Sequence, residues 1–157
     1  MDSNMIEKLF YMDNEIRKHF IGVYPVDMIP PLNQIGSIMV VNLDPSFMKG
    51  SHWIVLYVRD KNKVEYFDSL GKKPRKDIIT HLFHNHQICI YNSQRVQDYN
   101  TNSCGLFCLF YSYYACRLCT MISILSCFDD NLKNNEQIVT NFTKTYFSLY
   151  HDSYKLF

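Results

Sequence analysis

The distribution of apolar and polar residues predicts helices at both ends of the chain and strands in its middle. Residues 3–20 carry apolar side chains at roughly helical spacing, and residues 134–150 suggest a second amphipathic helix. Between them the pattern predicts strands at 36–43, 53–59, 64–68 and 87–92, with a short helix at 75–86. This order predicts an α+β fold in which helices pack against a small mixed, mainly antiparallel β-sheet.

Two further segments depart from this pattern in composition. Residues 22–34 hold three of the five prolines, which predicts an extended, irregular connection. Residues 104–127 are long and apolar enough to imitate a membrane span, with Arg117 as their single charge. Polar side chains are scattered along this segment and no Lys/Arg cluster flanks it. It therefore predicts a central buried helix, and no contact with a membrane.

The totals indicate one globular domain, residues 1–157, which we expect to be a monomer. Apolar residues make up 47% of the chain, enough for a sizeable core. The formal net charge of +1 gives no strong overall attraction to polyanions, so any such site must be local. The sequence begins MDSNMIEKLF, without a basic region followed by an apolar stretch, which predicts no secretion signal. The six cysteines then indicate reduced thiols in a protein that is not secreted.

Cys104 stands where a polar, turn-prone loop changes abruptly into the apolar segment. Asn102 or Ser103 would cap a helix that begins at Cys104 or Gly105. A thiol in the first turn of a helix lies near unpaired N–H groups and the positive end of the helix dipole, and both favour the reactive thiolate. Gly105 would let a substrate backbone approach closely. Cys104 is therefore a candidate nucleophile, although a small buried hydrophobic residue fits the same position.

A cysteine nucleophile needs an imidazole to take its proton and usually a third group to orient the imidazole ring. His52 precedes the strand predicted at 53–59, and Asp68 ends the next predicted strand. An antiparallel hairpin would bring both residues to the same end of the sheet. They share a face only if the hairpin loop is odd-numbered or a β-bulge intervenes. Taken singly, His52 also fits a polar residue at a strand end, and Asp68 fits a turn former.

Gln97 lies seven residues before Cys104 in the polar loop. Its side-chain amide can donate to a developing oxyanion, together with the backbone N–H of Cys104. A glutamine in a polar loop is ordinarily solvated, so this interpretation depends on the spacing alone.

The stretches GSHWIVLYV, YFDSLG and VQDYNTNSCGLFC, in this order, resemble the adenovirus-type cysteine endopeptidases. The pattern of that family is His-Trp on a strand, an acid at the end of the next strand, and then Gln-x6-Cys-Gly. With FIGVYPVDMIP, which is similar to the segment before the first strand in those enzymes, the resemblance covers about residues 19–115. It implies the fold that those enzymes share with proteases of ubiquitin-like modifiers. The roles it implies are base for His52, orienting acid for Asp68, oxyanion donor for Gln97 and nucleophile for Cys104.

The same resemblance implies a biological setting. The chain would cleave capsid or core precursor proteins of a virus or virus-like element during particle maturation, in the virion and the host nucleus. An isopeptidase that acts on ubiquitin-like modifiers is the alternative among enzymes. The acid here is Asp, whereas adenoviral enzymes usually have Glu, a longer side chain.

Two activators are also implied by the resemblance. Adenoviral relatives use DNA as a cofactor, so the stretch GKKPRK would contact phosphates, although a solvated loop has the same composition. Its basic residues are Lys72, Lys73, Arg75 and Lys76. Those relatives are also activated by a short peptide held by a disulfide, which here would involve Cys89. Because Cys89 alternates with two isoleucines in a predicted strand, a position that faces the core fits it equally well.

A set of histidines and cysteines offers a non-enzymatic alternative, a zinc-binding interaction module. The candidate ligands are His81, His84, His86 and Cys89 in one group and Cys116 and Cys119 in another. The predicted elements place these groups on helices and a strand, whereas structural zinc usually takes its ligands from loops or knuckles. No metal is therefore expected.

Overall fold

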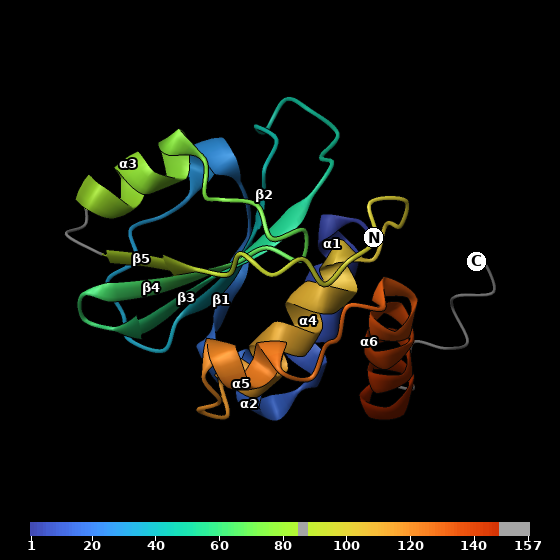
Figure 1. Cartoon of the computed structure of the whole chain (residues 1–157). Coiled ribbons are helices and arrows are strands. Elements are labelled where there is room, and N and C mark those ends of the chain that lie inside the picture. The colour runs from blue at the N-terminus through green and yellow to red at the C-terminus, as the bar shows by residue number, and fades with distance from the viewer. Residues whose placement is uncertain (85–87, 148–157) are drawn as a thin grey trace.

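The computed structural model describes residues 1–84 and 88–147, and its elements confirm the predicted α+β class. Five strands form one mixed sheet, in the order β1-β2-β3-β4-β5 (Figure 1). Their bounds are β1 Phe20–Pro25, β2 Ile38–Asn42, β3 Trp53–Asp60, β4 Lys63–Phe67 and β5 Ile88–Tyr91. The central pairs β2–β3 and β3–β4 are antiparallel, whereas the outer pairs β1–β2 and β4–β5 are parallel.

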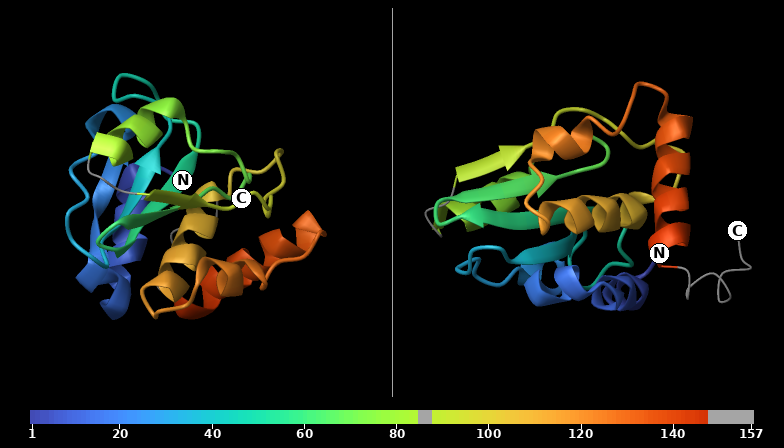
Figure 2. Two further views of the ribbon diagram at one scale, coloured as in Figure 1. Left: turned by 60° about the vertical axis from the view of Figure 1, so that its left-hand side comes forward. Right: turned by 90° about the horizontal axis from the view of Figure 1, so that it is seen from below.

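Helices cover both faces of the sheet (Figures 1 and 2). Their bounds are α1 Ser3–Met12, α2 Asn14–His19, α3 Lys76–His84, α4 Cys104–Ala115, α5 Met121–Leu125 and α6 Leu132–Tyr146, with a short 3-10 turn, η1, at Val26–Met28. The α3 helix packs on one face through Ile78 and Leu82. The opposite face packs against the core that α1, α2, α4, α5 and α6 build.

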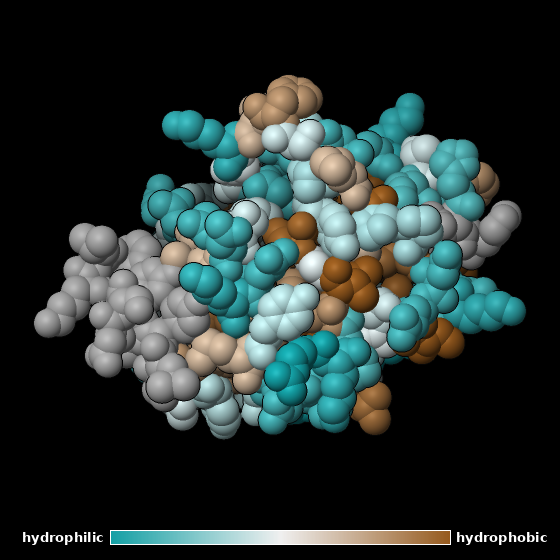
Figure 3. Space-filling view, turned by 180° about the vertical axis from the view of Figure 1, so that it is seen from behind, coloured by the Kyte–Doolittle hydropathy of each residue, from teal (hydrophilic) through white to brown (hydrophobic). Residues whose placement is uncertain are grey.

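The side chains of β3 alternate between these two cores. Val55 and Tyr57 point to the core around α4, whereas Ile54 and Leu56 point to the core beneath α3. Because both faces are covered, the strand is an almost continuous apolar run rather than an alternating one. The face seen in Figure 3 is mostly polar, with apolar side chains in small separate patches.

The first predicted helix is wrong as one continuous element. Asp13 adopts an extended conformation and ends α1, and its carboxylate accepts the N–H groups of Glu15 and Ile16 to begin α2. The irregular connection predicted at 22–34 is also partly wrong, because β1 runs to Pro25 at the edge of the sheet. Proline is compatible with an edge position, since it removes only one N–H from the strand.

The prediction of a single helix over residues 104–127 is wrong as well. The α4 helix ends at Ala115, and Leu118 takes a positive φ of 66° in the turn before α5. Arg117 holds this turn in place, because its guanidinium bonds both the Tyr113 carbonyl and the Asp13 carboxylate. None of the described helices has the length and hydropathy that a membrane crossing requires. The predicted ends at residues 86, 87 and 150 lie outside the described residues.

A buried ionic group ties the β3–β4 hairpin to α4. Glu65 accepts two hydrogen bonds from the Arg59 guanidinium, at 3.0 and 2.8 Å, and one from the Tyr111 hydroxyl. Arg59 also donates to the carbonyl of Cys119, beyond the end of α4. Because Glu65 is buried, its charge depends on these partners.

We predict that Glu65→Ala lowers the free energy of unfolding by about 3 kcal/mol, since it leaves the Arg59 charge partly buried without its partner. The matched control is Lys63→Ala on the same strand, which breaks only the exposed pair with Asp60 and should cost at most about 0.5 kcal/mol. Equal midpoints for the two variants in chemical denaturation would contradict the assigned role of this network.

Candidate active site

His52 and Asp68 flank the antiparallel pair β3–β4 at the same end of the sheet. His52 immediately precedes β3, and Asp68 immediately follows β4. The pairing register shifts between Val58 and Asp60, so the β-bulge that the parity condition allows is present. The last pair of the two strands at this end is Val55 with Phe67, so one step further Asp68 lies opposite Ile54. Ile54 and His52 are two residues apart and therefore point to the same face of the sheet.

The imidazole of His52 is hydrogen-bonded to the carboxylate of Asp68. The distance from Nε2 to Oδ1 is 2.7 Å, and the Asp68 side chain is fully buried. The same oxygen accepts the N–H of Leu70 at 2.8 Å. Asn92 holds the backbone of Asp68 on both sides, accepting its N–H at 2.9 Å and donating to its carbonyl at 2.7 Å. The position of Asp68 is therefore fixed by contacts other than the one with the imidazole.

The surroundings of His52 favour its protonated form. Burial alone would lower the pKa of His52, but hydrogen bonds to Asp68 and Cys104, with the negative charges of those groups, outweigh it and raise the pKa to about 9. Since Nε2 is occupied by Asp68, Nδ1 is the nitrogen left for the Cys104 thiol. Asp68 and Cys104 thus both act on the same imidazole, an arrangement able to carry an imidazolium beside a thiolate.

Cys104 is the first residue of α4, as the sequence predicts. Ser103 occupies the N-cap position, but it caps through its backbone only, and its side chain makes no cap hydrogen bond. The N–H groups of Cys104 and Gly105 lie in the first helical turn, where a helix supplies no acceptor. The thiol is nearly buried, with 6% of the residue exposed.

The space over Gly105 is filled by Met1. A Cβ atom built on Gly105 would lie 2.7 Å from the Met1 sulfur, and the indole of Trp53 donates to the Met1 carbonyl at 3.2 Å. The close approach to Gly105 in this structure is made by Met1, and the approach of a substrate backbone to Gly105 remains a prediction.

Gln97 is buried, with 2% exposure, and is not a solvated loop residue. Its Oε1 accepts the Ser69 hydroxyl at 2.6 Å, which fixes the orientation of the amide. Its Nε2 therefore points the other way and donates to the carbonyl and the hydroxyl of Thr101, at 3.1 and 3.2 Å. Both acceptors belong to the residue three positions before Cys104, so the amide donor lies toward the beginning of α4.

The loop that carries Gln97 is held against the end of β4. The carbonyl of Ser69 accepts the N–H groups of Val96 and Gln97, at 2.8 and 3.0 Å. Gly71 has φ +66°, and a Cβ atom there would lie 2.8 Å from both the Arg95 nitrogen and the Ser93 oxygen. Only glycine allows this contact between the two segments.

Sequence reasoning missed several residues that organise this site. They are Ser69 and Thr101, which lie in segments that the sequence presents as ordinary turns and loops, and Asn92, the last residue of the strand predicted at 87–92. Their roles depend on contacts between segments that are distant in the chain, and no sequence motif predicts these contacts.

The basic stretch from 71 to 76 lies beside the Gln97 loop. Lys72 and Arg95 both lie over the ring of Tyr99, which is 58% exposed. Arg75 is engaged elsewhere, with the Asp77 carboxylate at 2.7 Å and with the Leu43 carbonyl. Arg75 is thus exposed but paired with Asp77, whereas Lys72 and Arg95 lie exposed beside Tyr99. Arg95 is not part of the predicted basic stretch.

Cys89 lies in β5 and is half-buried against the core beneath α3. Burial raises the pKa of its thiol to about 11, which disfavours the thiolate. Its neighbours Ile88 and Ile90 point to solvent instead. This is the core-facing orientation, and a disulfide from Cys89 to an activating peptide remains a prediction.

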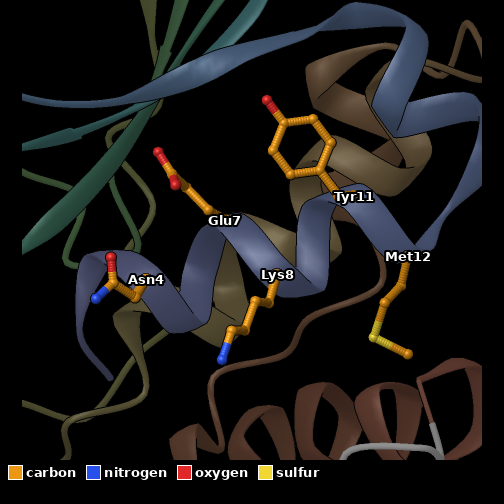
Figure 4. Close-up of a pocket in the computed structure, with 5 residues that line it drawn as sticks. All are labelled: Asn4, Glu7, Lys8, Tyr11 and Met12. Atoms are coloured by element: carbon orange, nitrogen blue, oxygen red, sulfur yellow. The ribbon is translucent and has the colours of Figure 1, made fainter.

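Within residues 1–84 and 88–147, no group of three or more His, Cys, Asp or Glu side chains could hold a metal ion. His81 interacts with the Pro30 carbonyl at 3.2 Å, and His86 lies outside the described residues. A hollow along α1 is lined by side chains of that single helix (Figure 4). They are Asn4, Glu7, Lys8, Tyr11 and Met12, without the thiol and imidazole that the candidate site contains.

No protein-family model matches the sequence, and comparison with curated proteins gives no match. Two structures of ASFV pS273R protease are similar in fold. The one with selenomethionine has 25% identity and a TM-score of 0.41, over 59% of this chain and 39% of the protease. The other has 18% identity and a TM-score of 0.48, over 71% and 55%.

The central domain of the uncharacterized Lpg1148 protein from Legionella pneumophila is also similar in fold. It has 13% identity and a TM-score of 0.43, over 81% of this chain and 88% of the domain. The chain spans only part of the ASFV protease, about two fifths of its length in the selenomethionine structure and just over half in the other. None of these three is an adenovirus protease, and a function must be inferred from the geometry of the site.

We predict that the His52 imidazole titrates with a midpoint near pH 9 in NMR spectra of the folded protein. The raised pKa contributes stability that is fully present below about pH 6.5, the value for an unperturbed histidine, and is lost as the pH rises through about 9. Asp68→Asn should move the midpoint down, because it removes the negative charge at Nε2. A midpoint near 6.5 in both proteins would contradict the charge assignment.

Proposed function

We propose that the chain is a cysteine endopeptidase with Cys104 as nucleophile, His52 as base and acid, Asp68 as orienting group and Gln97 as oxyanion donor. The observation that carries this proposal is the hydrogen bond of His52 to the buried Asp68 carboxylate, together with the nearness of the Cys104 thiol at the beginning of α4, which also raises the pKa of His52. The burial of Gln97 near the same helix end supports its assignment.

The reaction would proceed by acyl transfer. The thiol proton resides on His52, in an imidazolium–thiolate pair with Cys104, and the thiolate attacks the peptide carbonyl carbon. The negative charge that forms on the carbonyl oxygen is stabilised by N–H donors from the Cys104 backbone and the Gln97 amide. His52 then gives its proton to the leaving amine, which departs and leaves a thioester. Water, deprotonated by His52, hydrolyses the thioester and releases the carboxylic acid product.

The substrates that we propose are capsid or core precursor proteins of a virus or virus-like element, cleaved in the virion and host nucleus. This part follows the sequence resemblance to adenovirus-type endopeptidases. The same site would serve an isopeptidase of ubiquitin-like modifiers. Incubation with precursor proteins of the same genetic element, and separately with ubiquitin-like fusions, distinguishes the two by which of them is cut.

We predict that Cys104→Ala abolishes peptide cleavage while the protein remains folded. Gln97→Ala should lower turnover by roughly 10²–10³, the usual effect of removing an oxyanion donor. The matched controls are Cys127→Ala, an exposed thiol, and Gln94→Ala, an exposed glutamine in the same loop. Both controls should keep full activity in a steady-state peptidase assay. Residual cleavage by purified Cys104→Ala at the wild-type rate would refute the mechanism.

We also propose that DNA binds beside the site through Lys72, Lys73 and Lys76. Replacing all three with Gln should weaken DNA binding and flatten the plot of log affinity against log salt by roughly 0.9 for each phosphate that is no longer neutralised. Arg75 is kept, since it holds the Leu43 carbonyl. The control replaces the exposed Lys8, Lys61 and Lys133, which gives the same net charge. If both triple variants bind alike, the basic loop has no specific role.

A further inference from the structure

Helix α6 is joined directly to the loop that carries Gln97. Asn135, fully buried in the first turn of α6, donates to the carbonyl of Val96 at 3.1 Å and to that of Asp129 at 2.9 Å. Its Oδ1 accepts the N–H of Asp129 at 3.0 Å. The backbone immediately before Gln97 is thereby fixed to the helix, whose segment showed no motif in the sequence.

Glu136, the next residue of α6, reaches the other side of this loop. Its Oε1 lies 2.7 Å from the Thr101 hydroxyl and 3.4 Å from the N–H of Asp98. The Asp98 carbonyl lies 2.9 Å from the same hydroxyl, but the carboxylate is the stronger acceptor for its single hydrogen. The hydroxyl oxygen then offers its lone pairs to other donors.

Two donors of the candidate site lie within reach of this oxygen, the Gln97 amide and the Ser103 hydroxyl. Gln97 Nε2 lies 3.2 Å and the Ser103 hydroxyl 3.0 Å from the Thr101 oxygen. Thr101 thus connects Glu136 with the proposed oxyanion donor and with the N-cap residue before Cys104. Without the carboxylate, the Thr101 hydroxyl would donate to the Asp98 carbonyl instead and would lose its attachment to α6, so the Gln97 amide that it accepts from could shift.

Aromatic side chains pack α6 against α4. On α6, Phe142 packs against Phe110, Tyr113 and Tyr114 of α4, with ring centroids 5.0 to 5.9 Å apart. The two helices contact each other and cross, rather than run parallel (Figures 1 and 2). These contacts hold α6 against the middle and end of α4, while Asn135 and Glu136 in its first turns contact the loop that precedes Cys104.

We propose that Glu136 is a positioning residue for the reaction, acting through Thr101 on the orientation of the Gln97 amide. This rests on the proposed function. Glu136 touches neither substrate nor the reacting atoms. Its effect passes through Gln97 rather than through Ser103, because the Ser103 side chain makes no cap hydrogen bond to α4. Glu136→Gln, which retains an acceptor oxygen of the same reach, should preserve much of this effect, whereas Glu136→Ala removes it.

The test is a double-mutant cycle measured with a peptide amide that the wild-type protein cleaves. Glu136→Ala should lower kcat about 10- to 100-fold with little change in KM, as expected when a catalytic group is displaced by about 1 Å. In a Gln97→Ala background the same substitution should cost nothing further. Glu136→Gln should recover most of kcat, and Gln137→Ala, an exposed neighbour on α6, should match the wild type.

Two probes separate this inference from the proposed function. Alkylation of Cys104 by iodoacetamide needs no oxyanion donor, so Glu136→Ala should leave its rate unchanged. The side-chain amide resonances of Gln97 should shift in Glu136→Ala and stay in place in Gln137→Ala, whether or not the protein cleaves peptides. Unmoved resonances, or a kcat decrease that persists in the Gln97→Ala background, would overturn the inference while leaving the Cys104 mechanism standing.

Discussion

The hydrogen bond between His52 and Asp68 is the interaction on which the candidate site depends. Asp68 is fully buried, and its Oδ2 has no hydrogen-bond partner within the described part of the chain. Burying a carboxylate in this way is costly unless a cation lies against it. The imidazolium of His52 is that cation, so the same pairing that stabilises Asp68 keeps His52 charged beside Cys104.

The fold brings the members of the site together from four separate segments. Two of them are the ends of β3 and β4, where the bulge sets the parity of His52 and Asp68. A third is the loop of Gln97, which Ser69 and Asn135 hold from opposite sides. The fourth is the beginning of α4, a helix packed between the sheet and α6. Displacing any one of these supports would change distances that the proposed chemistry requires.

Sequence patterns predict the placement of His52, Asp68 and Cys104, because the ends of a hairpin and the beginning of a helix are local features. They do not predict that Gln97 is buried, since its partner Ser69 is 28 residues away in the chain. Sequence patterns also do not predict that residues 104–127 form two helices separated by a turn. Apolar residues continue through the turn at Leu118, and the side chain that fixes the turn, Arg117, is paired with the distant Asp13.

The central claim, that Cys104 carries the acyl group during turnover, can be measured directly. The protein is mixed with an activated ester of a short peptide, quenched in acid within the first turnover, digested and analysed by mass spectrometry. We predict a thioester on Cys104 alone, formed much more slowly in His52→Ala. An acyl group on another cysteine, or equal rates of formation with and without the imidazole, would contradict the account.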